Sequence, residues 1–380
     1  MFELTKEQKM LVKMTREFCD NEIAPYADEW DRTSKFPAEA VTKLAKLGLL
    51  GVNVPVEYGG AGLGEVEKAL VSMEIARACS STAEMFVVQL LVNGILVKNA
   101  NEEQKHKYLG MSCREGKLGA FGLTEPGAGS DAGSLQTTAV QDGDYWVLNG
   151  SKCFISNLGP NEGAYALVFA VTDKKKRSHG GMTAFIVDRD TPGFIVGKLE
   201  DKMGIRAAAV SELILEDCRV HKSQVLGQVG KGFNVAMSGL ESGRIGVAAQ
   251  ACGEAQAAFD TALEYAKQRS QFGKPIATKQ GIQWYLAEMA TKLEAAKLLD
   301  LKAAAMKDRG EPTAMNSSMA KFYAAEVANE IAAKALQIHG GYGYMKDYAI
   351  ERIYRDARIL TIYEGTSEVQ KIVIAKELLK

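Results

Sequence analysis

A run of small and polar residues near the middle of the chain has the chemistry to hold a flat ring or a phosphate. It reads Thr124-Glu125-Pro126-Gly127-Ala128-Gly129-Ser130-Asp131 and follows a predicted strand. Backbone N–H groups and hydroxyls in such a turn can approach a ligand closely, because glycine has no side chain to hold the ligand away. A plain connecting turn explains the same residues equally well, so this segment alone leaves both interpretations open.

The same segment contains a false match to a dinucleotide-binding pattern. Residues 127–132 fit GxGxxA, a degenerate form of that fingerprint. The fingerprint requires a helix to begin at the glycines, inside a strand–helix–strand unit. Residues 136–140 instead predict another strand, so a nicotinamide-type Rossmann site is disfavoured.

Metal, nucleic-acid and membrane sites find little support in the composition. The four histidines have no HExxH-type spacing and the six cysteines form no CxxC pair, so we expect no metal site and reduced thiols in a cytoplasmic protein. Lys and Arg number 46 against 47 Asp and Glu, which leaves no basic footprint for nucleic acid or anionic membranes. The first ten residues lack an apolar signal core, and no uninterrupted apolar run of about 18 residues predicts a membrane span.

One basic cluster, residues 174–177, lies between two predicted strands. It could be a patch for nucleic acid or an acidic partner, or the solvated tip of a hairpin. The near-zero net charge favours the hairpin tip.

The elements that must position these residues change character twice along the chain. Residues 1–117 predict helices, with a capping box at Thr5 and Gln8 and an apolar face formed by Met10, Leu11, Met14 and Phe18. Residues 118–228 predict short strands joined by Gly and Asp turns without crossover helices, which indicates an antiparallel barrel or sandwich. Residues 229–380 return to helices, including a long one through residues 282–296 that suggests a bundle. This order predicts an α+β protein of three domains.

Five segments, in order along the chain, resemble the signatures of the acyl-CoA dehydrogenases. They are residues 124–131, 148–157, 268–273, 337–344 and 362–368. The resemblance spans about residues 4–379 and is to the short-chain members, of the butyryl-CoA dehydrogenase and acryloyl-CoA reductase type. It implies an N-terminal helical domain, a central β-barrel or sandwich and a C-terminal four-helix bundle, assembled as a homotetramer with one FAD in each subunit.

The resemblance implies two groups of FAD contacts. Around the flavin ring it places Phe121, Leu123, Thr124, Ser130, Phe154 and Ser156, with Phe154 where many relatives have Trp. At the adenosine diphosphate of a neighbouring subunit's FAD it places Arg269, Gln271, Phe272, Gln337 and Gly341, because an arginine fork suits a pyrophosphate. Thr366 and Glu368 would also touch FAD.

Glu364 is the catalytic base that the resemblance implies. The implied reaction removes an α proton and a β hydride from an acyl-CoA thioester and passes electrons to an electron-transferring flavoprotein. An acryloyl- or aryl-acryloyl-CoA reductase would use the same residues in reverse. Tyr363 and Gly365 flank Glu364 and predict a tight turn that directs the carboxylate inward, although an ordinary loop glutamate is the alternative. Burial there should raise its pKa.

The resemblance implies substrate contacts from Ser130, Glu241, Arg244, Tyr363 and Gly365. Glu241 and Arg244 could instead form only an intrahelical pair. Some relatives carry the base directly before this arginine, where the chain has Gly243, which strengthens the choice of Glu364. Two further alternatives are another FAD-dependent thioester reaction, which the presence of Glu364 disfavours, and a non-enzymatic scaffold, which the complete set of motifs disfavours.

Two departures from the family pattern bear on the ligands. Residues 207–210 are Ala-Ala-Ala-Val where the family has small hydroxyl residues, which puts hydrogen bonds from there to the flavin in doubt. Residues 78–113 contain no Arg, which disfavours a dicarboxylic substrate. Residues 85–90 are expected near the acyl pocket, but the length of the acyl chain and its aryl or aliphatic character cannot be read from them.

Overall fold

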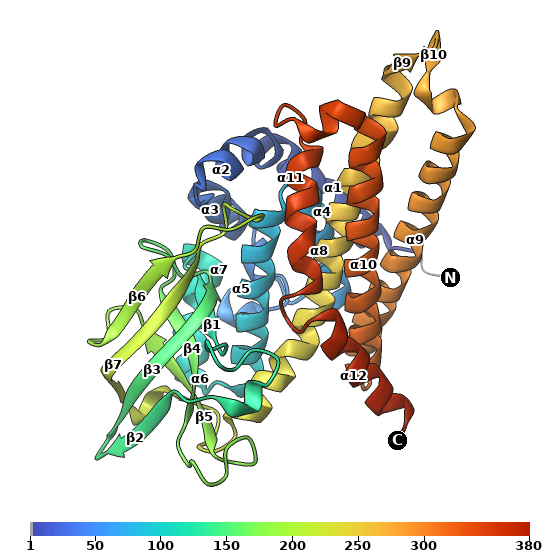
Figure 1. The fold of residues 1–380 in the computed structure, drawn as a ribbon. Coiled ribbons are helices and arrows are strands. Elements are labelled where there is room, and N and C mark those ends of the chain that lie inside the picture. Colours follow the sequence, from blue (N-terminus) through green and yellow to red (C-terminus); the bar gives the residue numbers. More distant parts are fainter. Residues whose placement is uncertain (1–2) are drawn as a thin grey trace.

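The computed structural model describes residues 3–380, and its elements follow the order helices, strands, helices (Figure 1). The expected capping box is present, since the Gln8 backbone N–H donates to Thr5 Oγ1 and the Thr5 N–H to Gln8 Oε1. The expected apolar face is wrong for Met10 and Met14, which are exposed, because the buried positions of the first helix are Thr15 and Cys19. The N-terminal helices are α1 (Lys6–Glu22), α2 (Ala27–Thr33), α3 (Ala38–Lys46), α4 (Glu65–Ala78), α5 (Ser80–Asn99), α6 (Glu102–Gln104) and α7 (Gly110–Glu115).

The central strands form one eight-stranded sheet in the order β6-β7-β3-β2-β4-β5-β8, with β1 beside β4. Most neighbours are antiparallel as expected, but β1 pairs with β4 in parallel and β2 meets β4 in parallel at one position. The β2–β3 hairpin supplies the return connection that a parallel pair needs. The basic cluster 174–177 lies in exposed turns between β4 and β5. The strands are β1 (Gly119–Gly122), β2 (Thr138–Asp142), β3 (Tyr145–Ser156), β4 (Tyr165–Val171), β5 (Met182–Asp188), β6 (Phe194–Leu199), β7 (Val210–His221) and β8 (Val225–Leu226).

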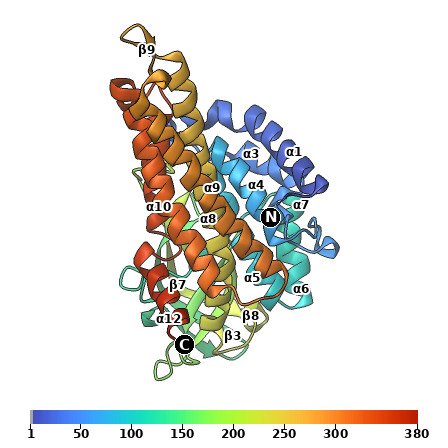
Figure 2. The same ribbon diagram turned by 90° about the vertical axis from the view of Figure 1, so that its right-hand side faces the viewer.

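The C-terminal helices lie side by side as a bundle in Figures 1 and 2. The helices α8, α9 and α10 are long, and α11 packs against both α8 and α10. A short hairpin of β9 and β10 joins α8 to α9 at one end of the bundle. The bounds are α8 (Gly232–Gln268), β9 (Ser270–Gln271), β10 (Lys274–Pro275), α9 (Gln280–Asp308), α10 (Ala314–His339), α11 (Ile350–Ala357) and α12 (Ser367–Leu378).

Three glycines of α8 let α5 approach it closely. A Cβ atom on Gly239, Gly243 or Gly246 would stand within 2.7 Å of side-chain atoms of Ile95, Leu91 and Val87, respectively. These α5 residues are spaced by one helical turn, so they share one face. We call this contact the α5–α8 seam.

Helix α5 is the one helix within residues 3–380 that is long and apolar enough to cross a membrane. No such segment was expected from the sequence. In the fold, 89% of the relevant stretch is buried, and the helix lies between the β domain and α8. It is therefore a core helix of this fold, which explains its apolar composition.

Candidate active site

A tight turn between α11 and α12 carries Glu364. Glu364 and Gly365 both have positive φ, 54° and 93°, a conformation that is uncommon for a residue with a side chain and that recurs at functional sites. The Gly365 carbonyl accepts hydrogen bonds from Lys321 Nζ at 2.7 Å and Gln370 Nε2 at 2.9 Å. The expected tight turn is present, and α10 and α12 hold it from two sides.

The turn directs the Glu364 carboxylate into the fold. Oε2 is buried and has no hydrogen-bond partner within residues 3–380. A Cβ atom on Gly243 would lie 2.2 Å from Oε2 and 2.7 Å from Leu91 Cδ1. The alternative of an ordinary surface glutamate does not match this placement, and the carboxylate reaches the α5–α8 seam at Gly243.

Burial raises the pKa of Glu364 to about 7, and the positive charges of Lys321, Arg244 and Lys68 oppose this rise. Lys321 itself is buried, which lowers the pKa of its ammonium group to about 8. A carboxylate near neutral pKa with cations close by is the arrangement expected of a general base working near pH 7.

Arg244 lies on α8 one residue beyond Gly243 and is only 9% exposed. Its Nη1 donates to Ser318 Oγ at 3.4 Å, while its Nε is buried with no partner among the described residues. Glu241 pairs with Lys307 at 3.5 Å, and no ion pair joins Glu241 to Arg244 in residues 3–380. The alternative of an intrahelical pair is therefore wrong, and Arg244 keeps donors available for an anionic ligand.

A buried ion pair between Glu125 and Lys152 of β3 holds the loop 124–131 in place. Lys152 Nζ lies 2.7 Å from Glu125 Oε1 and also donates to the carbonyl oxygens of Leu123 and Phe169. The Glu125 carboxylate accepts the backbone N–H groups of Gln136 and Thr137. Burial acts to raise the pKa of Glu125, but Lys152 together with these donors lowers it below its ordinary value. No helix begins at the glycines, because a 3-10 turn and then β2 follow; the rejection of a Rossmann site is confirmed. Ser130 is exposed on this loop and Thr124 is half-buried.

A bulge in β3 presents Phe154. The β3–β7 register shifts between Lys152 and Ile155, and Phe154 has φ of 58°. Its ring is 66% exposed, so an aromatic surface faces outward beside Ser156. Phe121 and Leu123 lie at the end of β1 on the neighbouring part of the sheet.

The departure at residues 207–210 has a structural explanation. Ala207, Ala208 and Ala209 are buried, and Ala207 packs in the core of the N-terminal helices. The Ala208 carbonyl accepts a hydrogen bond from Lys202 Nζ at 2.9 Å. This segment therefore packs on the N-terminal helices through methyl groups.

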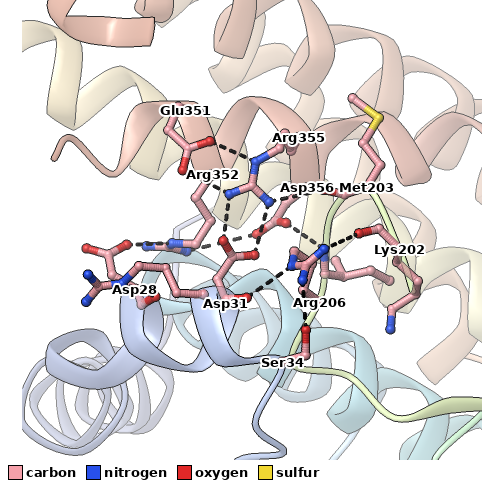
Figure 3. A network of polar contacts seen from close by, with 12 residues as sticks. Asp28, Asp31, Ser34, Lys202, Met203, Arg206, Glu351, Arg352, Arg355 and Asp356 are labelled. Atoms are coloured by element: carbon pink, nitrogen blue, oxygen red, sulfur yellow. Dashed lines mark hydrogen bonds and ion pairs between the residues drawn. The ribbon is translucent and has the colours of Figure 1, made fainter. Parts of the chain in front are cut away.

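An ion-pair network joins all three parts of the chain beside this segment (Figure 3). Arg355 of α11 binds Asp31 of α2 at 2.6 and 3.1 Å and also contacts Glu351 and the Met203 carbonyl. Arg206 donates to the Asp31 carbonyl, and Asp356 accepts the Ile205 N–H. Because α11 leads directly into the Glu364 turn, this network fixes where that turn begins.

A second cluster lies at the β9–β10 end of the bundle. It surrounds a cavity of about 570 Å³ whose lining includes Arg269, Gln271 and Gly341. The Arg269 guanidinium lies 5.3 Å from the Tyr342 ring centre. His339 donates Nδ1–H to the Ala335 carbonyl, which leaves Nε2 buried and without a partner in the described chain. Phe272, 91% exposed, and Gln337, also exposed, lie outside this lining.

The two clusters are far apart in one chain. Arg244 and Arg269 both belong to the α8 segment and are 25 residues apart, which corresponds to about 37 Å of helix. Figures 1 and 2 agree, since β9 lies at the end of the bundle away from the β domain. A ligand bound beside Arg244 and Glu364 would have to span about this distance to reach Arg269 of the same chain.

Three family models cover almost the whole chain. They are the N-terminal, middle and C-terminal domains of acyl-CoA dehydrogenases, at residues 5–115, 120–218 and 230–379. The chain belongs to the acyl-CoA dehydrogenase family. It is therefore a flavin-dependent oxidoreductase, and the expected fold class is confirmed.

Relatives within the acyl-CoA dehydrogenase family match over nearly their full length. Acryloyl-CoA reductase (NADH) of Anaerotignum propionicum is 50% identical, over 100% of this chain and 96% of that protein. The CarC subunit of the caffeyl-CoA reductase–Etf complex of Acetobacterium woodii is 47% identical, over 99% of both. The structure of butyryl-CoA dehydrogenase from Megasphaera elsdenii has a TM-score of 0.97 and 42% identity over all of both chains.

The residues present suit the FAD on which acyl-CoA dehydrogenases depend. The exposed Phe154 ring offers a surface for the isoalloxazine. The cavity at the β9–β10 end offers the Arg269 fork and the unpartnered His339 Nε2. Gly340 and Gly341 face open space, with no atom within 4 Å of an added Cβ, so a ligand could approach that backbone closely.

Several residues of both clusters were not predicted as site residues from the sequence. Lys321 and Lys68 place positive charge near Glu364, but single lysines in apolar helices carry no sequence signal. His339 and Tyr265, whose rings stack at 4.3 Å, line the cavity at the β9–β10 end. The glycines after His339 gave a hint of that cavity. Gln89, which is expected near the acyl pocket, donates to Asn93 Oδ1 and accepts the Gly119 N–H.

Proposed function

We propose that this chain dehydrogenates a short-chain acyl-CoA thioester between its α and β carbons, with Glu364 as the base, and passes the electrons to an electron-transferring flavoprotein. The observation that carries the proposal is the buried, unpartnered Glu364 Oε2 with a pKa raised to about 7. An α proton of an aliphatic thioester is very weakly acidic, so its removal needs a desolvated base held against the reacting carbon.

The surrounding residues support each part of that step. Glu364 takes the α proton, and its backbone N–H would bind the thioester oxygen as charge develops there. Bound FAD would supply the hydride acceptor for the β carbon. Arg244, with its unpartnered Nε, and Glu241 would contact the coenzyme A portion, and Ser130, Tyr363 and Gly365 would line the thioester.

The cofactor residues would act in two places. Phe121, Leu123, Thr124, Ser130, Phe154 and Ser156 would hold the flavin end of FAD near Glu364, with Thr366 and Glu368 at the start of α12. Arg269, Gln271, Phe272, Gln337 and Gly341 would hold the adenosine diphosphate of a neighbour's FAD.

That division of residues requires at least two subunits, since the two clusters of one chain are too far apart to share a cofactor, and it supports the proposed homotetramer. The exposed Phe272 and Gln337 would be covered by the neighbour. All six cysteines are free and buried, which suits a cytoplasmic enzyme with reduced thiols.

A second candidate is the reverse reaction, reduction of an acryloyl- or aryl-acryloyl-CoA. A pKa of about 7 leaves a large share of Glu364 protonated at neutral pH, which is the form that must donate a proton to the α carbon. The acryloyl-CoA reductase and caffeyl-CoA reductase relatives favour this direction.

The test is a panel of thioesters with the FAD-loaded protein under anaerobic conditions. Saturated short-chain acyl-CoAs should bleach the oxidised flavin, and the matching enoyl-CoAs should reoxidise the reduced flavin. The faster direction distinguishes the two candidates. A purified protein that neither retains FAD nor responds to any acyl-CoA would refute both.

A further inference from the structure

Glu84 is a buried carboxyl group that the proposed mechanism does not use. It lies on α5 three residues before Val87, seven before Leu91 and eleven before Ile95, so it continues the face of α5 that forms the α5–α8 seam. On α8 the seam continues from Gly246 to Gln250, whose side chain accepts the Tyr363 hydroxyl and donates to Ser80. Glu84 therefore lies in the seam at the level of Tyr363, the residue before the base.

Neither oxygen of Glu84 has a hydrogen-bond partner within residues 3–380, and the residue is only 1% exposed. The polar and charged groups near enough to affect the pKa of its carboxyl group come from three other elements: the Ser156 hydroxyl of β3, which favours the ionised form, Lys202 of the β6–β7 connection, and Tyr363 with Glu364 of the catalytic turn. Lys202 does not pair with it, since its Nζ donates to the carbonyl oxygens of Ala208 and Glu200.

Other buried acidic residues differ from Glu84 in their hydrogen-bond partners or in their charged neighbours. Glu254 accepts the Ser80 hydroxyl, and Asp356 accepts the Ile205 N–H and faces Arg352. Asp300 on α9 also lacks partners, but its charged neighbours are Lys68 and Glu65. A buried carboxyl without a partner destabilises the fold unless a ligand supplies the missing donor, and Glu84 is the unpartnered acid between Ser156 and Tyr363.

We propose that Glu84 is a specificity-determining residue at the acyl end of the substrate site, and that it selects acyl thioesters whose distal end carries a hydrogen-bond donor, a hydroxyl or an ammonium group. The inference rests on the proposed function, which places the acyl chain against Tyr363 and Glu364. Val87 and Leu91 make the part of this α5 face that follows Glu84 apolar, so among these three side chains Glu84 is the acceptor. A site built to accept a hydrogen bond discriminates strongly against an analogue that lacks the donor.

The experiment compares thioesters of equal size. The pairs are 4-hydroxybutyryl-CoA with pentanoyl-CoA, and 5-hydroxypentanoyl-CoA with hexanoyl-CoA; 4-aminobutyryl-CoA tests the ammonium group. Rates of flavin bleaching and dissociation constants from calorimetry are measured for the wild type, Glu84→Gln and Glu84→Met. Asp300→Asn is the matched control, because it neutralises a different unpartnered buried acid.

The wild type should prefer the donor-bearing member of at least one pair by about tenfold or more in both rate and binding. Glu84→Met should reverse that preference, Glu84→Gln should retain part of it, and Asp300→Asn should leave the ratio unchanged. Thermal unfolding of each variant establishes that it is folded.

The outcomes separate this inference from the proposed function. If butyryl-CoA bleaches the flavin but neither pair shows a preference, or if Glu84→Met leaves the ratios unchanged, the role of Glu84 is refuted and the dehydrogenase stands. If no thioester bleaches the flavin, the proposed function fails and this inference fails with it.

Discussion

Gly243 provides the space that the carboxylate of Glu364 occupies: a Cβ atom at position 243 would lie 2.2 Å from Glu364 Oε2. Some relatives carry the base at the position of Gly243. In this chain a side chain there would collide with the Glu364 carboxylate. The sequence showed only that Gly243 could not be the base. The structure adds that Gly243 makes room for the base on another segment.

We predict that Gly243→Ala lowers the rate of dehydrogenation by about 10² or more, because the new methyl group displaces the carboxylate from the reacting carbon. FAD binding should be retained. Gly239→Ala is the control: its methyl group would meet Ile95 of the same seam at 2.5 Å but not Glu364. Steady-state kinetics and flavin absorbance measure both, and equal losses of activity would contradict the role given to Gly243.

We predict that the rate of dehydrogenation rises with pH around a midpoint near 7, because Glu364 must be ionised and burial raises its pKa to about 7. Reduction of an enoyl-CoA should fall over the same range. Lys321→Met removes a cation that lowers the pKa of Glu364, so the midpoint should move to higher pH. An unchanged midpoint in Lys321→Met would show that another group controls the profile.

The raised pKa values of Glu84 and Glu364 should make the folded protein less stable as the pH rises. Glu84 and Glu364 have pKa values of about 7 in the folded protein against 4.5 ordinarily, so the folded state binds more protons between these values. The free energy of unfolding should therefore fall as pH rises from about 5 to 7, and Glu84→Gln should reduce the fall by on the order of 2 kcal/mol. Urea unfolding of the FAD-loaded protein at pH 5, 6 and 7.5 measures this fall in the free energy of unfolding. If Glu84→Gln leaves the pH dependence unchanged, the raised pKa of Glu84 is contradicted.

We predict that Arg269→Ala weakens FAD binding, whereas Lys267→Ala, exposed at the same end of α8, does not. If Arg269 serves a neighbour's FAD, mixed oligomers of Arg269→Ala and Glu364→Gln subunits should regain activity. In such a mixed oligomer, the site of an Arg269→Ala subunit contains its own Glu364 and the Arg269 of a neighbouring Glu364→Gln subunit, so it is complete. Absence of any recovery after co-expression, with mixed oligomers shown by mass spectrometry, would contradict sharing of the site.

Much of the fold could be predicted from local sequence features. The capping box at Thr5, the buried run of β4 and the long α9 depend on neighbours in the chain, and each is present. The parallel pairing of β1 with β4 could not be predicted in the same way, because strand pairing depends on contacts between distant residues.

The candidate site was predictable where a motif surrounds the residue, as for Glu364 between Tyr363 and Gly365. Lys321 and Glu84 lie in helices whose sequences resemble any buried helix, and only packing brings them toward the turn. The burial of Ala207 likewise follows from the N-terminal helices against which it packs.

The most direct measurement is anaerobic titration of Glu364→Gln with a thioester that bleaches the wild-type flavin. Glutamine keeps the size of the side chain but cannot accept the α proton. The variant should bind the thioester, seen as a perturbed flavin spectrum, yet lose bleaching by about 10³ or more. Glu377→Gln, near the end of α12 where the side chain pairs with Lys380, should behave as wild type. Bleaching of Glu364→Gln at the wild-type rate would contradict the assignment of Glu364 as the base.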